Sequence, residues 1–142
     1  MSRAYRRLAW SDPHGLIARG AQSFLYFAHI VDTAGFEYRY IGKSAGRRPR
    51  LADYRRNVDR IFKGQPRRTT QGQEKYRAVH LAMAKACEYG WEYEFYALEE
   101  VSPDRIDDVE QRRIVELASN LNNSSSWAVE EYDSLMVRDL LR

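Results

Sequence analysis

The sequence predicts an α/β protein of the α+β kind, in which a small three-stranded antiparallel sheet is flanked by helices. Two strand-like runs at 23–31 and 36–41 are separated by a turn signal, and a third run at 91–98 alternates between apolar and polar residues. Segments with helical spacing separate these runs. We expect one domain, residues 1–142, because a chain of this length fits a single core.

The first two strands are expected to form a hairpin. Residues 23–31 are almost continuously apolar, which is typical of a buried strand. The turn signal Asp-Thr-Ala-Gly at 32–35 follows, and aromatic residues alternate with polar ones over 36–41. Gly42 is expected to end the second strand, to let the chain turn sharply and to let a ligand approach the backbone closely.

Three helices are expected around the sheet. The first, at about 49–62, would begin with Pro49, and the second would run from about 73 to 89 with Gly90 as its C-cap. The third would run to about 118 from a cap at Ser102 or Asp104. The domain core would then cover about 23–124, between an N-terminal arm (1–22) and a C-terminal helix (about 127–142).

Charge is distributed unevenly along the chain. Residues 43–68 carry ten Lys or Arg against two acids, or +8, so the remaining residues carry −5 to give the total of +3. Such a basic block suits a polyanion such as nucleic acid, although a solvated basic helix is the alternative. The sequence contains neither an apolar run long enough to span a membrane nor a signal peptide, and its single cysteine, Cys87, excludes an internal disulfide. A reducing, cytoplasmic location is expected.

Glu110 is the most unusual residue of the expected third helix. At about 100° per residue, Ile106 and Ile114 lie within about 40° of it, so the carboxylate faces the apolar side of the helix. A carboxylate in that position requires an ion-pair partner, hydrogen bonds or a metal ion. A simple Glu–Arg pair would also meet that requirement. Glu116 is a weaker candidate because it lies at the edge of the apolar face.

The expected first helix and the strand before it contribute further polar groups. Arg50 and Tyr54 are four residues apart and therefore share one face of the helix, where the guanidinium would bind a carboxylate or a phosphate. Lys43 directly follows Tyr40, Ile41 and Gly42.

Together these residues resemble the GIY-YIG nuclease family. The resemblance rests on Tyr-Ile-Gly-Lys-Ser at 40–44, with Arg50 and Tyr54 ten and fourteen residues after Tyr40, and on Phe-Leu-Tyr at 24–26 upstream. Glu110 and the Leu-Asn-Asn run at 121–123 match the metal-binding Glu and the downstream Asn of the family. Phe24 stands where the family signature has its first glycine.

The resemblance implies a metal-dependent endonuclease that hydrolyses phosphodiester bonds of double-stranded DNA, as in small restriction-type or phage-type members. Its catalytic residues would be Tyr26, Tyr40, Lys43, Arg50, Tyr54, Glu110 and Asn122, with Asn123 as the alternative to Asn122. Glu110 would hold one Mg²⁺ or Mn²⁺ ion. Arg50 would bind the scissile phosphate. Tyr26, beside Tyr40, would orient or deprotonate the attacking water, which requires a lowered pKa.

DNA binding is expected from the basic block around Arg50. Its members are Lys43, Arg47, Arg48, Arg55, Arg56, Arg60, Lys63, Arg67 and Arg68. Contacts of this kind position a duplex without specifying its bases. A homodimer or larger assembly would allow both strands to be cut. A non-catalytic nucleic-acid-binding domain and an RNA-directed nuclease are the alternatives.

Overall fold

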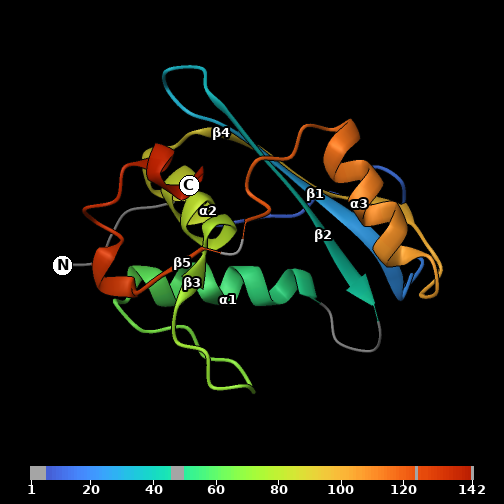
Figure 1. Cartoon of the computed structure of the whole chain (residues 1–142), viewed down its shortest axis with the longest axis horizontal. Helices are drawn as coiled ribbons and strands as arrows, with labels where there is room; N and C mark the ends of the chain where they lie inside the picture. Colours follow the sequence, from blue (N-terminus) through green and yellow to red (C-terminus); the bar gives the residue numbers. More distant parts are fainter. Residues whose placement is uncertain (1–5, 46–49, 124, 142) are drawn as a thin grey trace.

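The computed structural model describes residues 6–45, 50–123 and 125–141. Its centre is a three-stranded antiparallel sheet in the order β2-β1-β4 (Figure 1). β1 (Ser23–Val31) pairs with β2 (Glu37–Ala45) along its whole length and, on its other edge, with β4 (Glu92–Glu100). The predicted α+β class with a three-stranded antiparallel sheet is therefore confirmed.

Both faces of β1 are covered, which explains its almost continuous apolar sequence. Tyr26, Ala28 and Ile30 point into the main core, where α1 (Arg50–Phe62) and α2 (Ala78–Tyr89) pack. On the opposite face Leu25 joins a smaller apolar cluster beneath α3 (Ile106–Glu116). Strands buried on both sides lose the polar alternation of a half-exposed sheet.

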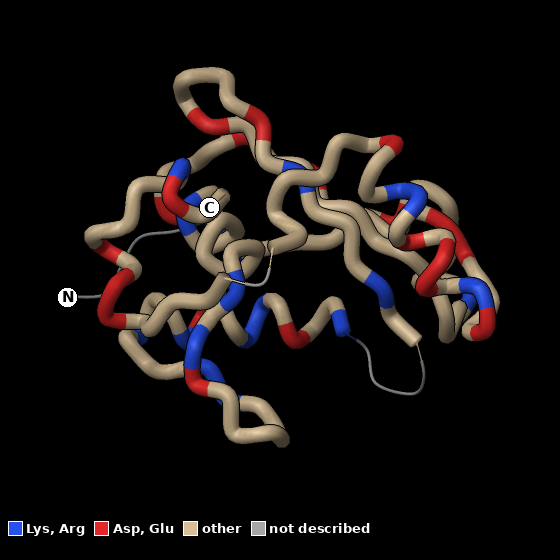
Figure 2. The backbone as a smooth tube through the Cα atoms, in the orientation of Figure 1, with Lys and Arg blue, Asp and Glu red and all other residues tan. Residues whose placement is uncertain are grey.

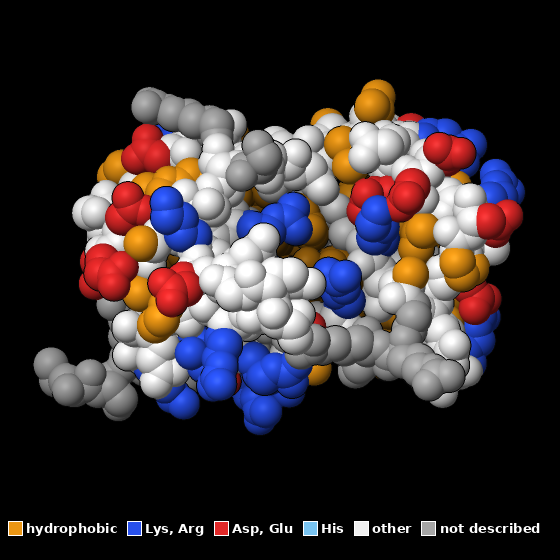
Figure 3. All heavy atoms as spheres, turned by 60° about the horizontal axis from the view of Figure 1, so that its bottom comes forward, with side chains coloured by type: hydrophobic (Ala, Val, Ile, Leu, Met, Phe, Trp, Pro, Cys, Tyr) orange, Lys and Arg blue, Asp and Glu red, His pale blue; other side chains and the backbone are white. Residues whose placement is uncertain are grey.

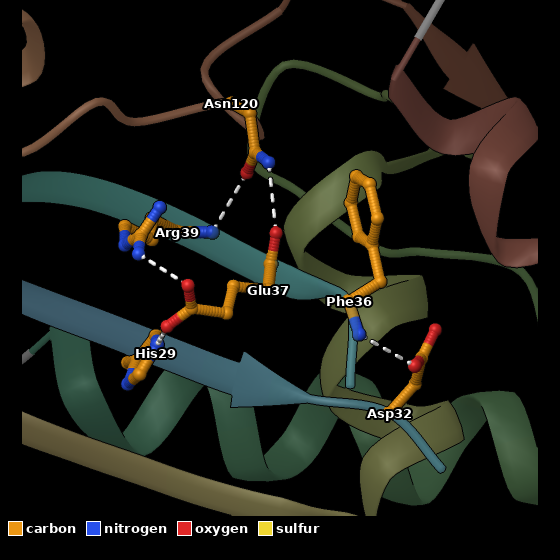
Figure 4. Close-up of polar contacts among 6 residues, drawn as sticks. All are labelled: His29, Asp32, Phe36, Glu37, Arg39 and Asn120. Atoms are coloured by element: carbon orange, nitrogen blue, oxygen red, sulfur yellow. Dashed lines mark hydrogen bonds and ion pairs between the residues drawn. The ribbon is translucent and has the colours of Figure 1, made fainter. Parts of the chain in front are cut away.

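The hairpin between β1 and β2 forms as the turn signal predicts. The Asp32 carboxylate accepts the backbone N–H groups of Ala34 at 2.9 Å and of Phe36 at 3.0 Å, and Gly35 has φ +85°. Figure 4 shows this end of the hairpin. Gly42 does not end β2, contrary to the prediction, because the strand continues through it to Ala45.

The helices differ from their predicted bounds at their N-terminal ends. α1 begins at Arg50, and Pro49 lies outside the described residues. α2 begins at Ala78 rather than near residue 73. The two residues before it form β3 (Tyr76–Arg77), which pairs with β5 (Ser126–Trp127). This pairing joins residues about fifty positions apart, so the local helical pattern could not predict it.

The predicted start of the third helix was also wrong. α3 begins at Ile106 after Arg105, which makes no side-chain cap, so neither Ser102 nor Asp104 is the N-cap residue. The helix ends at Glu116, shortly before the predicted end near residue 118.

The C-terminal helix predicted for about 127–142 is not formed. After β5 the chain makes two short 3₁₀ helices, η1 (Val129–Glu131) and η2 (Val137–Leu141). Tyr132 and Leu140 are buried in the main core, and the Lys85 ammonium group of α2 donates to the Tyr132 carbonyl oxygen at 2.9 Å. The segment therefore forms tight turns instead of the predicted helix, and these turns bury Tyr132 and Leu140 against the core.

The N-terminal arm packs against the sheet, first as an extended segment over 6–12 and then as a series of turns over 13–20. Leu8 and Leu16 are buried, and the Ser11 N–H donates to the Phe95 carbonyl of β4 at 2.7 Å. The arm therefore covers part of the β4 edge, which would otherwise present unpaired backbone groups. None of the helices in the described part of the chain is long and apolar enough to cross a membrane.

Candidate active site

Three tyrosines meet where β1, β2 and α1 come together. The Tyr26 ring centroid lies 6.3 Å from that of Tyr40 and 5.6 Å from that of Tyr54. The hydroxyl oxygens of Tyr26 and Tyr54 are 2.6 Å apart, within hydrogen-bond distance. All three side chains are buried, so the cluster forms the floor of the candidate site.

Gly42 makes room for this cluster. It lies opposite Tyr26 in the β1–β2 register, and a Cβ atom on Gly42 would overlap the Tyr26 ring. The Tyr26 ring therefore crosses over the backbone of the neighbouring strand. The glycine is required for this close approach, rather than for the sharp turn that the sequence suggested.

Arg77 is a site residue that the sequence analysis missed. Its Nη1 donates to the Tyr40 hydroxyl oxygen at 3.3 Å, and its guanidinium carbon lies 5.6 Å from the centroid of the Tyr40 ring. It makes no ion pair with any residue that the structure describes. Arg77 is also the N-cap residue of α2, where a cation faces the positive end of the helix dipole. That unfavourable placement was the available signal, but only once the start of the helix was known.

The acidic side of the site lies on α3. Glu110 is largely buried, with 14% of its side chain exposed, and its Oε1 lies 3.9 Å from the ammonium nitrogen of Lys43 on β2. Lys43 also pairs with Asp107. Burial raises the pKa of the Glu110 carboxyl above its usual value, although the charges of Lys43 and Arg77 oppose the shift. Glu110 is thus a partly buried acid beside cations, as the helix pattern predicted, and its ion-pair partner is a lysine rather than an arginine.

Arg50 lies at the start of α1 and is exposed. It makes no ion pair with a described residue. Its charge acts to lower the pKa of Tyr26 and of Lys43, and it lines the same pocket as Tyr54. The sequence suggested that Arg50 points partly inward; in the structure it is available at the surface of the site.

The structure does not lower the pKa of Tyr26, which its predicted role as a base requires. Burial raises the pKa of the Tyr26 hydroxyl well above its usual value, and the nearby Tyr40 adds to the effect. Burial likewise raises the pKa of Tyr54. Tyr26 and Tyr54 are therefore neutral hydroxyls that hydrogen-bond to each other. The Tyr40 hydroxyl oxygen accepts a hydrogen bond from Arg77.

Asn122 rather than Asn123 braces the strand that carries the site. The Asn122 side chain accepts the Ile41 N–H at 3.0 Å and donates to the Ile41 carbonyl at 2.7 Å, directly between Tyr40 and Gly42. The Asn123 amide donates instead to Leu140 at the C-terminal end of the chain.

Asn120 binds β2 in a similar way further from the site. Figure 4 shows its amide bonded to the backbone of Arg39 and of Glu37, while the Glu37 carboxylate contacts His29 and Arg39. The loop after α3 thus holds β2 at two successive points. These contacts fix the position of Tyr40 and Lys43 relative to α3.

The predicted metal site would take one carboxylate ligand, Glu110, from the chain. No group of three or more His, Cys, Asp or Glu side chains suited to a metal occurs in the described parts of the chain. Mg²⁺ commonly keeps several water ligands and takes only one or two protein carboxylates. The partly buried Glu110 carboxylate, with its raised pKa, fits such a site because a cation would offset the cost of its ionisation.

Two of the predicted DNA-binding residues, Arg47 and Arg48, lie outside the described residues. The others divide into residues that bond to partners within the chain and residues that gather at the end of α1 and in the loop after it. Some members have partners within the chain: Lys43 and Arg56 are in ion pairs, and Arg55 donates to the Leu8 carbonyl at 3.1 Å. Figure 2 shows that Lys and Arg positions gather on α1 and the loop that follows it. Arg60, Lys63, Arg67 and Arg68 belong to this region. We therefore expect any polyanion to bind on this side.

A pocket of about 450 Å³ opens beside the tyrosine cluster. It is lined by one side of α1 from Arg50 to Arg60, by the loop around Thr69 and Thr70, and by the start of α2, and Tyr54 forms part of its wall. Figure 3 shows this face, where Lys and Arg side chains surround a hollow. Six arginines line the pocket: Arg50, Arg56, Arg60, Arg67, Arg68 and Arg77. We refer to it as the arginine pocket.

His80 is a second residue whose position the sequence did not reveal. It lines the arginine pocket, and its ring lies 5.4 Å from that of Tyr54. Its Nδ1 accepts the backbone N–H of Arg77 at 3.1 Å. Burial and the charges of Arg67 and Arg77 lower the pKa of His80 well below its usual value. The ring is therefore neutral and holds the start of α2 in place.

Comparison of the chain with protein-family models, with curated proteins and with solved structures finds no match.

Proposed function

We propose that this protein is a metal-dependent endonuclease that hydrolyses phosphodiester bonds of double-stranded DNA. The main support is the gathering of complementary groups from separate elements. A partly buried acid on α3 lies 3.9 Å from a lysine on β2, and Arg77, which makes no ion pair with a described residue, contacts Tyr40 on the same strand. The charge of Arg77 also acts to lower the pKa of Glu110, which supports assigning the acid and the tyrosines to one site.

Each residue of the site has a separate role in the proposed reaction. Arg50 and Lys43 supply positive charge for the phosphate, on which negative charge builds in the transition state. Glu110 would hold one Mg²⁺ ion, which when bound neutralises phosphate charge and assists the leaving oxygen. As a phenolate, Tyr40 would orient the attacking water and accept its proton, which leaves a neutral Tyr40 hydroxyl, and the Arg77 guanidinium would stabilise the phenolate before that transfer.

Tyr26 and Tyr54 have a supporting role in this proposal. Their hydroxyls bond to each other in the buried floor, where ionisation is unfavourable. They fix the Tyr40 ring and the first turns of α1. This assignment moves the role of the base from Tyr26, which the sequence favoured, to the neighbouring Tyr40.

The experiment is nicking of supercoiled plasmid with Mg²⁺ or with EDTA, and with an RNA substrate in parallel. We expect Mg²⁺-dependent nicking of DNA that Arg50→Ala slows at least about 100-fold, since loss of a key electrostatic group has that effect. Arg112→Ala, an exposed arginine on α3, is the matched control. Binding without cleavage would favour a non-catalytic nucleic-acid-binding domain, and cleavage of RNA alone would favour an RNA-directed nuclease.

Two copies of this centre would be needed to cut both strands of a duplex in one event. The site described here contains one Glu110 and one Arg50 per chain. We therefore include a homodimer in the proposal, with two successive nicks as the alternative. The appearance of linear plasmid without a nicked precursor distinguishes the two routes.

A further inference from the structure

The arginine pocket extends beyond the groups that the proposed hydrolysis requires. Arg50, Tyr54 and Arg77 belong to both the pocket lining and the candidate active site, while Arg60, Arg67 and Arg68 lie near the end of α1 and in the loop after it, away from α3 (Figure 1). The reaction at one phosphate has no use for these additional cations. Their position raises the question of which ligand they bind.

The charge of the pocket is almost entirely positive. Its lining contains six arginines and one acid, Asp53, which already pairs with Arg56. Arg67 and Arg77 make no ion pair with a described residue, although each acts electrostatically on the other. Like charges held close together are unfavourable unless an anion lies between them or nearby.

Arg67 shows the clearest sign of a missing partner. Its Nε atom is buried and has no hydrogen-bond acceptor in the described structure, and its Nη1 reaches only the Lys75 carbonyl, at 3.5 Å. Burial, together with the charge of Arg77, lowers its pKa. A buried guanidinium donor without an acceptor costs free energy that a bound anion would recover.

The remaining lining is polar and suits an oxyanion. Thr69, Thr70 and Gln73 belong to the loop that forms the outer wall, and Asn57 and the neutral His80 lie on the helices behind it. An arginine fork matches phosphate geometry with two parallel hydrogen bonds. The volume of about 450 Å³ is larger than a single phosphate needs and leaves space for an attached sugar.

We propose that the arginine pocket is a phosphate-binding subsite that holds a backbone phosphate of the nucleic acid next to the scissile one. This inference rests on the proposed function for the position of the scissile phosphate at Arg50. The shared wall of Arg50, Tyr54 and Arg77 makes the subsite continuous with the active site. One strand would then run from Glu110 across the tyrosine cluster and into the pocket.

The test measures binding of a DNA duplex in EDTA, so that no cleavage occurs. Arg67→Gln and Arg68→Gln should each weaken binding by about tenfold and reduce the slope of log K against log salt by about one, as loss of one phosphate contact does. Arg112→Gln removes the same charge outside the pocket and should bind as the wild type does. Circular dichroism verifies that each variant is folded.

Two further arms identify the source of the phosphate. Inorganic phosphate and a nucleoside diphosphate are titrated against the wild type and Arg67→Gln. Tight binding of either that requires Arg67, with duplex binding unchanged by Arg67→Gln and Arg68→Gln, would overturn the proposal in favour of a small-molecule site. Unchanged binding of every ligand would overturn it altogether.

The failure of this inference is distinguishable from failure of the nuclease proposal. If the wild type never cleaves, but duplex binding requires Arg67 and Arg68, the phosphate subsite stands without the activity. If it cleaves and the variants bind normally, the activity stands without the subsite.

Discussion

At the scale of single residues, Arg77 connects the two halves of the candidate site. It contacts the Tyr40 hydroxyl directly and acts on the Glu110 carboxylate through its charge. A guanidinium in this position can stabilise charge on a phenolate oxygen without an ion-pair partner of its own. Arg77 has this position because it is the last residue of β3 and the N-cap residue of α2. The boundary between these two elements could not be predicted from the sequence.

Replacement of Arg77 tests this role. Arg77→Gln should slow cleavage by about tenfold to a hundredfold and move the rise of rate with pH to higher pH, because the phenolate form of Tyr40 that the reaction requires loses its stabilising cation. Arg77→Lys should restore part of the rate. The measurement is a single-turnover pH profile. A slower rate with an unmoved profile would mean that Arg77 has only a structural role.

His80 gives a prediction about stability and pH. The pKa of His80 is lowered in the folded state. Below the unfolded-state pKa of about 6.5, His80 is therefore protonated in the unfolded chain but stays neutral in the folded one. Stability should therefore fall on acidification, by up to about 1.4 kcal/mol for each pH unit below about 6.5. Urea unfolding of the wild type and His80→Gln between pH 7 and pH 5 measures the difference. Equal losses in both proteins would contradict the neutral, buried state of His80.

At the scale of elements, the β1–β2 hairpin carries most of the predicted site. The spacing of Tyr26, Tyr40 and Lys43 on two paired strands follows directly from alternation and the turn signal, so these positions could be predicted. The function of Gly42 could not, because its close approach to Tyr26 depends on the register between the strands.

Gly42→Ala should destabilise the protein by about 3 kcal/mol, at the upper end of the range for overpacking, because the new methyl group overlaps a ring that has no free space. Gly64→Ala is the control: it has φ +68° but open surroundings, and should cost only about 1 kcal/mol. Denaturant unfolding measures both changes. In a Tyr26→Ala background the cost of Gly42→Ala should largely disappear; a cost that persists would show that the ring is not its cause.

The predicted helices were reliable where one face is apolar over several turns. Tyr54, Val58 and Ile61 are buried along α1 as their spacing indicates. The C-terminal segment has similar spacing but forms 3₁₀ helices. Tyr132 and Leu140 are buried against α2 in this conformation, so a regular helix is not needed to bury them. Periodicity identifies which residues are buried more reliably than it identifies the backbone conformation that buries them.

At the scale of the whole molecule, the fold brings together residues that the sequence separates widely. Tyr26 lies on the central strand and Glu110 on a helix across the sheet, yet Lys43 contacts Glu110, and the charge of Arg77 acts on both Tyr26 and Glu110. The sequence could predict this set only through a resemblance to a nuclease family. The arginine pocket could not be predicted, since it needs α1, the loop around Thr69 and the start of α2 to enclose one space.

The most direct test of the account is single-turnover cleavage of a DNA duplex in Mg²⁺ by Glu110→Gln and by Glu116→Gln. Both substitutions remove one carboxylate from α3, but the Glu116 side chain is 47% exposed and pairs with Arg113. We predict that Glu110→Gln binds the duplex and cleaves at least about 100-fold more slowly, while Glu116→Gln retains the wild-type rate. Cleavage by Glu110→Gln at the wild-type rate would contradict the claim that this carboxylate is the metal-binding group of a nuclease.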